Sequence, residues 1–314
     1  MSFRAVCLTD DMQLKRTLRR SLHGAGSQVE FVLNAAALEA RITDFAEPDL
    51  IVLDAAGRRD VDLARLGRLN RTQVICIGES IERDDVLALL RGTRLNHVIS
   101  DPAVQEEDAL IVTSGKVFNP VDIFGIEKYL AWGALVHERS VSTYESKREA
   151  LLQVSAYAVD VGARRQIVAR IESVADELLM NALYDAPAAR AGLDPSATVG
   201  HEAHPRPMSG EAAILRYACD GRYLAVSVRD GYGELRKDAI LDHIERARAM
   251  RGSPQLKPSG GAGLGLYFVV TSVTRFIANI SPGRATEVIG LFDIKATGRD
   301  QEGCAKSLHI FTTP

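Results

Sequence analysis

A glycine-rich stretch that turns abruptly apolar constrains this 314-residue chain more than any other feature. Residues 260–270 read GGAGLGLYFVV, with four glycines in the first six positions. Glycine at this density costs backbone entropy, so the segment indicates unusual dihedral angles or close approach by another group. Exposed backbone amides in front of a helix bind anions. The stretch therefore predicts a phosphate-binding loop followed by a buried helix.

The overall composition is that of an ordinary globular protein and argues against several partners. A chain of 314 residues exceeds one typical core, which predicts two domains. The formal net charge of −3 leaves no basic footprint for nucleic acid or an anionic membrane. The four cysteines lie far apart, which favours buried thiols over a metal site. With no signal-peptide pattern and no uninterrupted apolar span, we expect a cytoplasmic protein without nucleic-acid or membrane partners.

The first 118 residues alternate short apolar runs with amphipathic segments. The apolar runs RAVCL, QVEFVL, DLIVLD, QVICIG and NHVIS are predicted strands. Strands that alternate with helices predict an α/β domain, in which helices cover both faces of a parallel sheet. The loops after the strands form the functional rim of such a sheet. Asp10 and Asp11 follow the first strand and Asp54 follows the third, so all three are expected at this rim.

These acidic positions resemble those of a response-regulator receiver domain, which has a flavodoxin-like fold. The resemblance implies that Asp10 and Asp11 hold Mg²⁺ and that Asp54 accepts a phosphoryl group. Two positions depart from the family, because Gly78 stands in place of Thr or Ser and Asp101 in place of Lys. A carboxylate at the lysine position repels a phosphoryl group. Two interpretations stay open: a receiver-like domain kept for docking or dimerisation, and an atypical phosphoacceptor.

The rest of the chain has a different organisation. Residues 119–140 are predicted to form a linker helix that carries Trp132, and residues 141–314 a second domain. Two long amphipathic helices, the second ended by Pro187, precede a hairpin around Asp220. Two further helices and closing strands, the last at CAKSLHIFTT, complete the pattern. This order predicts an α+β sandwich, with helices on one face of a mixed sheet.

Glu177 and Asn181 are four residues apart on the second long helix, so both project from the same face. An Asn amide oxygen can ligate Mg²⁺, and a carboxylate one turn earlier can act as a base or orient water. Taken alone, this spacing is also common on solvated helix faces.

Two glycine-containing turns complete the set of candidate site residues. Asp230, Gly231 and Gly233 follow a predicted strand, where a carboxylate can accept a hydrogen bond from an exocyclic amine; a plain turn is the alternative. The backbone amides of residues 261–266 are available to a phosphate chain, the alternatives being a dinucleotide-binding loop or a hinge. A dinucleotide-binding loop follows a strand directly, whereas this one follows the loop residues KPSG, which weakens that alternative.

The three motifs in this order resemble the N, G1 and G2 boxes of the GHKL (Bergerat-fold) ATP-binding superfamily. Gly283 and Thr286 are similar to a further strand start in that superfamily. The resemblance implies that Glu177 is the general base, that Asn181 binds Mg²⁺ and that Asp230 holds the adenine amine. It also implies that residues 234–260 form a lid, from which Arg236, Lys237 or Lys257 reaches the γ-phosphate. The implied ATP-binding residues are Asn181, Asp230, Gly231, Gly233, Gly261, Gly263, Leu264, Gly265, Leu266 and Thr286.

Within that superfamily the chain resembles the anti-sigma-factor serine kinases more than the sensor histidine kinases. His137 lies too close to Asn181 for a phosphoacceptor on a separate two-helix domain. The resemblance therefore implies a signalling kinase that acts on a protein partner under control of the receiver-like domain, and it leaves homodimerisation open. Two alternatives remain: a nucleotide-gated scaffold with little turnover, and a histidine-kinase-like enzyme that phosphorylates a partner in trans.

Overall fold

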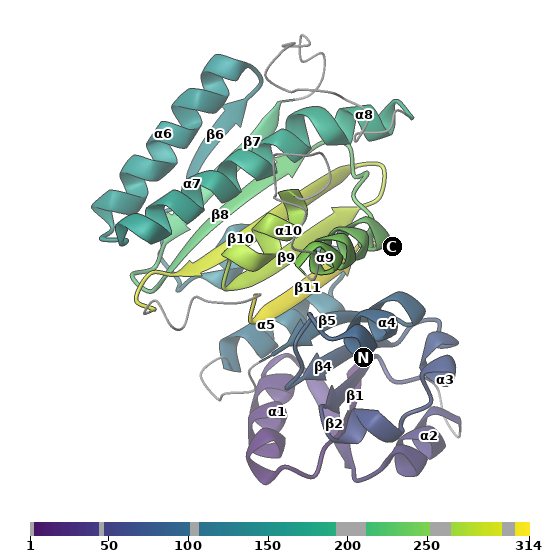
Figure 1. The fold of residues 1–314 in the computed structure, drawn as a ribbon. Coiled ribbons are helices and arrows are strands. Elements are labelled where there is room, and N and C mark those ends of the chain that lie inside the picture. Colours follow the sequence, from purple (N-terminus) through teal and green to yellow (C-terminus); the bar gives the residue numbers. More distant parts are fainter. Residues whose placement is uncertain (1–2, 44–46, 101–106, 193–211, 252–264, 297–304) are drawn as a thin grey trace. The chain divides into compact units, whose positions relative to one another are not determined.

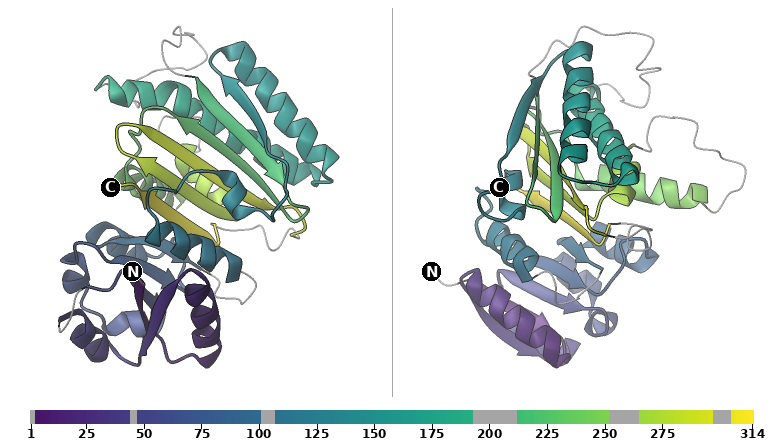
Figure 2. Two further views of the ribbon diagram at one scale, coloured as in Figure 1. Left: turned by 180° about the vertical axis from the view of Figure 1, so that it is seen from behind. Right: turned by 90° about the vertical axis from the view of Figure 1, so that its left-hand side faces the viewer.

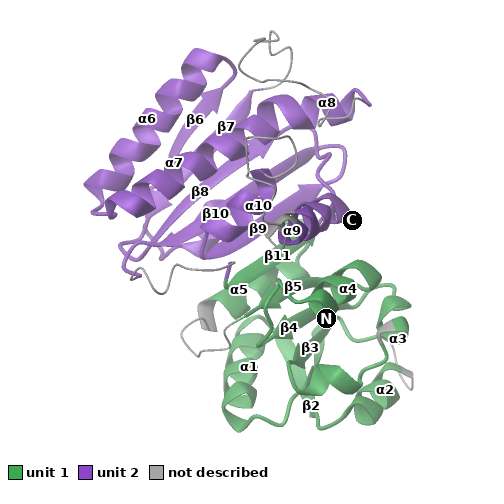
Figure 3. Cartoon of the chain, viewed as in Figure 1, with its two compact units in different colours: residues 1–123, 306–311 green, residues 124–305, 312–314 purple. Residues whose placement is uncertain are grey.

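The computed structural model describes residues 3–43, 47–100, 107–192, 212–251, 265–296 and 305–314 (Figure 1). The chain divides into two compact units (Figure 3). Unit 1 comprises residues 1–123 and 306–311, and unit 2 comprises residues 124–305 and 312–314. Both units combine helices with a sheet, which confirms the predicted α/β class. Among the described residues, no helix is both long enough and apolar enough to cross a membrane.

Unit 1 contains a parallel sheet with the strand order β2-β1-β3-β4-β5. This is the doubly wound order in which loops at the carboxyl ends of the strands form the functional edge. The strands are β1 (Phe3–Leu8), β2 (Ser27–Val32), β3 (Leu50–Asp54), β4 (Gln73–Ile77) and β5 (Leu95–Ile99). The helices are α1 (Met12–Gly24), α2 (Ala35–Thr43), α3 (Leu63–Gly67), α4 (Asp84–Gly92) and α5 (Glu107–Phe118), with a 3₁₀ turn, η1 (Gly57–Asp60).

Local sequence explains why these elements form. Every residue of β3 is buried, as expected for a central parallel strand covered on both faces. Helix α1 begins where the Asp11 carboxylate accepts hydrogen bonds from the backbone amides of Gln13 and Leu14, at 2.7 and 3.0 Å. Leu18 and Leu22 lie one turn apart on α1 and are fully buried in the core of unit 1.

The last strand, β11 (Ser307–Thr312), pairs antiparallel with β5 of unit 1. The sequence analysis placed this segment among the closing strands of the C-terminal domain. Leu308 lies opposite Val98 and His309 opposite His97 in the register of the pair. The first five residues of β11 are buried, so the strand suits a position covered on both faces. Its pairing also satisfies backbone groups of β5 that an edge strand leaves unpaired.

We expect Leu308→Ala to destabilise the β5–β11 pair, because Leu308 is fully buried. Removing a buried Leu side chain costs about 2–5 kcal/mol. Hydrogen exchange of the β5 amides measures the effect, with Thr312→Ala as the control because Thr312 is exposed at the end of the same strand. Equal exchange of β5 in the two variants would show that β11 does not stabilise unit 1.

Unit 2 contains a sheet with the order β9-β10-β8-β7-β6, in which every described pair is antiparallel. The sequence analysis expected a mixed sheet here. The strands are β6 (His137–Val141), β7 (Ala213–Cys219), β8 (Tyr223–Asp230), β9 (Arg275–Ser281) and β10 (Ala285–Asp293). The hairpin predicted around Asp220 joins β7 to β8.

The helices of unit 2 gather on one face of this sheet, as the two views in Figure 2 show. They are α6 (Tyr144–Asp160), α7 (Arg165–Met180), α8 (Ala186–Arg190), α9 (Lys237–Arg251) and α10 (Gly265–Ser272). Helix α7 packs between α6 and α10 and contacts β8 and β10 beneath it. This layer is therefore where helix residues and strand ends can meet.

Two predictions about helix boundaries are wrong. Pro187 does not end the helix that contains Asn181, because α7 continues through a π-helical turn, η4 (Asn181–Asp185), into α8. Proline is tolerated in the first turn of a helix, where its missing N–H is not needed, and Pro187 occupies that place in α8. The expected linker helix is only a 3₁₀ turn, η3 (Ile126–Tyr129), and Trp132 is fully exposed beyond it.

Candidate functional site

The glycine-rich stretch lies only partly within the described residues. Gly261, Gly263 and Leu264 lie outside them, whereas Gly265 and Leu266 begin helix α10. Leu266 is buried. The end of the stretch thus leads directly into the predicted apolar helix.

The start of α10 lies directly against the side chain of Glu177 on α7. A Cβ atom built on Gly265 would overlap the Glu177 carboxylate. The close approach that the glycine-rich stretch predicted is therefore present at this position, since any side chain at residue 265 would require the Glu177 carboxylate to move. Two motifs far apart in the sequence meet at this contact.

The surroundings of Glu177 favour its protonated form. Burial raises the pKa of Glu177 to about 7, and the negative charges of Asp185 and Asp176 act in the same direction. Lys147 of α6 lowers this pKa, and its Nζ atom lies 2.6 Å from Asp176 Oδ1. The carboxyl group of Glu177 therefore gains or loses its proton near neutral pH. A general acid or base that works at neutral pH needs a pKa in this range.

Sequence reasoning missed Lys147, Asp176 and Asp185 as neighbours of Glu177. Lys147 is on a different helix, and its side chain is only 11% exposed. Asp176 precedes Glu177 in the chain, while the π-helical turn brings Asp185 close enough to act on it. The signal in the sequence is that Lys147 has the same helical spacing as Ala150, Val154 and Ala158, which form the buried face of α6.

We expect Glu177→Gln to stabilise the protein above neutral pH. The folded-state pKa of about 7 lies above the value of 4.5 for the unconstrained group, so ionisation of Glu177 opposes folding as pH rises through this interval. At pH 8 the variant should be more stable by up to about 3 kcal/mol, and at pH 4 the difference should vanish. Denaturant unfolding at the two pH values measures this, and a pH-independent difference would contradict the assigned pKa.

Asn181 lies at the junction of α7 and the π-helical turn. In this turn the backbone N–H of Ala186 donates to the Asn181 carbonyl, five residues earlier. Single π-helical turns are rare and occur frequently at functional sites. The turn contacts β8, whose last residue is Asp230. Asn181 thus lies one helical turn beyond Glu177, on a segment packed against the strand that carries the next motif.

Asp230 ends β8 and is only 9% exposed. Its Oδ1 atom accepts hydrogen bonds from the backbone amides of Tyr232 and Gly233, at 2.8 and 3.1 Å. Burial raises the pKa of Asp230, whereas these amides and Thr286 lower it. The predicted turn is present, with Gly231 half-buried inside it. A buried carboxylate at a strand end can accept a hydrogen bond from a ligand amine.

Thr286 lies directly opposite Asp230 in the register of β10 and β8. It is only 3% exposed, and its hydroxyl has no hydrogen bond of regular geometry within the described chain. Buried hydroxyl groups are ordinarily satisfied. The hydroxyl nevertheless lies near enough to Asp230 to lower the pKa of that carboxyl group, so the two side chains form one buried polar pair.

Gly233 fixes the turn against the hairpin between β9 and β10. Its φ is +68°, and a Cβ atom there would overlap the Ser281 carbonyl and lie 2.6 Å from the Arg284 nitrogen. The Gly283 amide donates to the Gly233 carbonyl at 3.1 Å. Gly283 also has a φ of +68°, so both turns require glycine.

Two glycines offer a matched comparison, because both have positive φ but only one is crowded. Gly221 has a φ of +90° with no atom within 4 Å of an added Cβ, in contrast to Gly233. We expect Gly221→Ala to cost about 1 kcal/mol and Gly233→Ala clearly more, since overlap adds to backbone strain. Thermal unfolding measures both. A similar loss of stability in the two variants would mean that the turn at Gly233 packs less tightly against the β9–β10 hairpin than the structure shows.

The predicted lid is described only through Arg251. Lys237 begins α9, and burial lowers its pKa to about 8, while Asp238 raises it. Arg236 is exposed, and Lys257 lies outside the described residues. A partly buried ammonium group near the turn that follows Asp230 suits an anionic ligand.

Asp10, Asp11 and Asp54 lie at the rim of unit 1, as predicted from their places after β1 and at the end of β3. Asp10 is exposed, and the Asp11 carboxylate caps α1 as described above. Asp54 Oδ1 accepts a hydrogen bond from the Gly57 amide at 2.5 Å. Among the residues that the structure describes, no group of three His, Cys, Asp or Glu side chains is placed to hold a metal ion. The Mg²⁺ and phosphoacceptor roles that the receiver resemblance implied for Asp10, Asp11 and Asp54 stay predictions, and Asp101 lies outside the described ranges.

Comparison with known proteins finds remote similarity to solved structures. No protein-family model matches the chain, and no curated protein matches it. A chain from the crystal structure of the SiaB-SiaC complex of Pseudomonas aeruginosa is 18% identical with a TM-score of 0.31, covering 50% of this chain and 88% of that one. A fusion containing the yeast Spc42 trimeric coiled coil is 12% identical with a TM-score of 0.32, covering 51% and 97%. At these TM-scores, neither similarity bears on function.

Proposed function

We propose that unit 2 binds Mg²⁺-ATP and transfers the γ-phosphoryl group to a hydroxyl of a protein partner. The observation that carries this proposal is the contact of Gly265 with the Glu177 carboxylate. It brings the end of the glycine-rich stretch to a carboxylate that titrates near neutral pH. A phosphate held by the start of α10 would then lie beside a general base.

The other site residues fit the remaining parts of the nucleotide. Asp230 and Thr286 form a buried acceptor and donor pair at the end of β8 and start of β10, suited to an adenine ring. Asn181 would supply an amide oxygen to Mg²⁺, which neutralises phosphate charge and polarises the γ-phosphoryl group. Lys237, at the start of α9, would stabilise phosphate oxygens.

A hydroxyl group of a partner protein is a better acceptor of the γ-phosphoryl group than a histidine of this chain. His137 lies in β6, where its ring stacks on Tyr217 at 5.2 Å and meets the edge of Tyr157 at 4.9 Å. A phosphoacceptor histidine must reach a γ-phosphate, whereas this ring is packed between aromatic side chains. The proposal thus places the chain in a cytoplasmic signalling pathway with a protein substrate, with the receiver-like unit 1 as its regulatory part.

Calorimetry of ATP binding, with and without Mg²⁺, tests the nucleotide site. We expect Asp230→Ala to weaken binding about a hundredfold, since a buried charged hydrogen-bond partner of the ligand is lost. Asp220→Ala is a matched control, because Asp220 Oδ1 likewise accepts from two backbone amides, Arg222 at 2.9 Å and Tyr223 at 2.7 Å. Absence of ATP binding to the folded wild-type protein would overturn the proposal.

Phosphoryl transfer is tested separately on proteins that co-purify with the chain. We expect Glu177→Gln to keep ATP affinity but to lower the transfer rate about a hundredfold or more, because the base is removed. Glu172→Gln is the control, since Glu172 is exposed on the same helix and its carboxylate accepts from Ser155. Tight binding without transfer in the wild type would instead favour a nucleotide-gated scaffold.

A further inference from the structure

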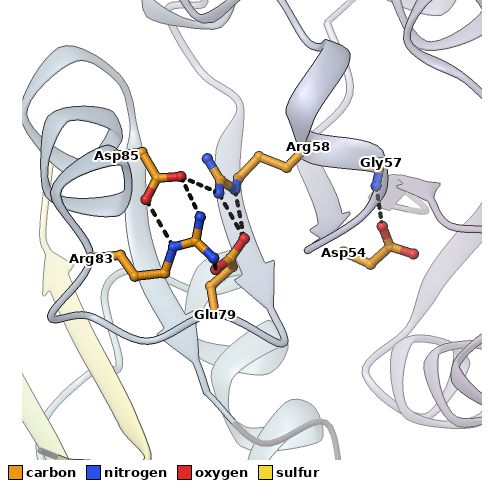
Figure 4. A network of polar contacts seen from close by, with 6 residues as sticks. All are labelled: Asp54, Gly57, Arg58, Glu79, Arg83 and Asp85. Carbon is orange, nitrogen blue, oxygen red and sulfur yellow. Dashed lines mark hydrogen bonds and ion pairs between the residues drawn. The ribbon is translucent and has the colours of Figure 1, made fainter.

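Four charged side chains form a closed ring at the carboxyl ends of β3 and β4 in unit 1 (Figure 4). Arg58 Nη2 lies 2.7 Å from Glu79 Oε1 and 2.8 Å from Asp85 Oδ2. Arg83 completes the ring, with Nη1 3.3 Å from Glu79 Oε2 and Nη2 2.9 Å from Asp85 Oδ2. Positive and negative groups alternate, so each one touches two of opposite sign and the ring has no net charge.

The inner half of the ring is buried. The side chains of Arg58 and Glu79 are 5% and 3% exposed, whereas those of Arg83 and Asp85 are about half exposed. Hydrogen bonds to Asp85 and Glu79 outweigh the effect of burial and raise the pKa of Arg58. Separating a buried pair leaves an uncompensated charge in the protein interior, which is strongly unfavourable. The ring therefore resists any movement that separates its members.

The ring is continuous with the turn that holds Asp54. Asp54 ends β3, Gly57 donates its amide to Asp54 Oδ1, and Arg58 is the next residue. A Cβ atom on Gly57 would lie 2.7 Å from Leu8 Cγ and 3.0 Å from Asp54 Oδ1, so this turn has no spare room. Arg58, the cation next to this turn, is already bound by two carboxylates. It is thus unavailable to neutralise a phosphoryl group on Asp54.

We infer that this ring latches residues 79–85 in a single arrangement, so that unit 1 presents the same surface whatever the state of Asp54. Unit 1 then does not act as a phosphorylation switch. The inference rests on contacts within unit 1 and holds whether or not unit 2 binds ATP.

Hydrogen exchange of residues 79–87 in the full chain, with and without acetyl phosphate and Mg²⁺, tests the latch. We expect unchanged exchange in the wild type, whether or not intact mass shows a phosphoryl adduct. An exchange change that appears with acetyl phosphate and is lost in Asp54→Asn would overturn the inference.

The variant Arg58→Met tests the ring itself. We expect about a hundredfold faster exchange of residues 79–87, because Glu79 loses its buried partner. Arg59→Met is the matched control, since Arg59 is the exposed neighbour in the same turn. The double variant Arg58→Met with Glu79→Met removes both buried charges and should restore slow exchange. If Arg58→Met behaves like Arg59→Met, or if it fails to fold and the double variant still exchanges rapidly, the latch does not exist.

Discussion

The contact between the backbone of Gly265 and the carboxylate of Glu177 is the constraint on which the candidate site depends. It brings the start of α10 against a side chain of α7, and both helices lie on the sheet face to which Asp230 and Thr286 belong. A larger residue at the start of α10 would displace the Glu177 carboxylate from its present position. In the proposed function, the backbone that would hold phosphate and the side chain that would accept a proton would then no longer share one place.

Features with a local signal could be predicted from the sequence. The alternation of strands and helices in the first half, the hairpin at Asp220 and the long helix that carries Glu177 all follow from periodicity and turn residues. The turn after Asp230 also follows from its own glycines, because a residue with positive φ is required there. Each of these elements is decided by neighbours a few residues away in the chain.

Features that depend on distant segments could not be predicted. The sequences of β5 and β11 have the apolar character of ordinary strands, and this character does not indicate that the two strands pair with each other. The approach of Lys147 to Asp176 joins two helices, and the pair of Arg58 and Glu79 joins two loops. Pro187 misled for a related reason, since the π-helical turn before it places Pro187 in the first turn of α8, where proline is tolerated. Long-range pairing and irregular turns are invisible to local patterns.

The placement of β11 also determines the order in which unit 1 can be completed during synthesis. Strand β5 leaves the ribosome early, whereas β11 follows all of the other described strands. Until then, the backbone groups of β5 that later pair with β11 lack this partner, and an unpaired strand edge is prone to associate with other chains. The first unit to be translated is thus the last whose sheet can be finished. Its final assembly must wait for the segments of the second unit that lie between the two strands in the sequence.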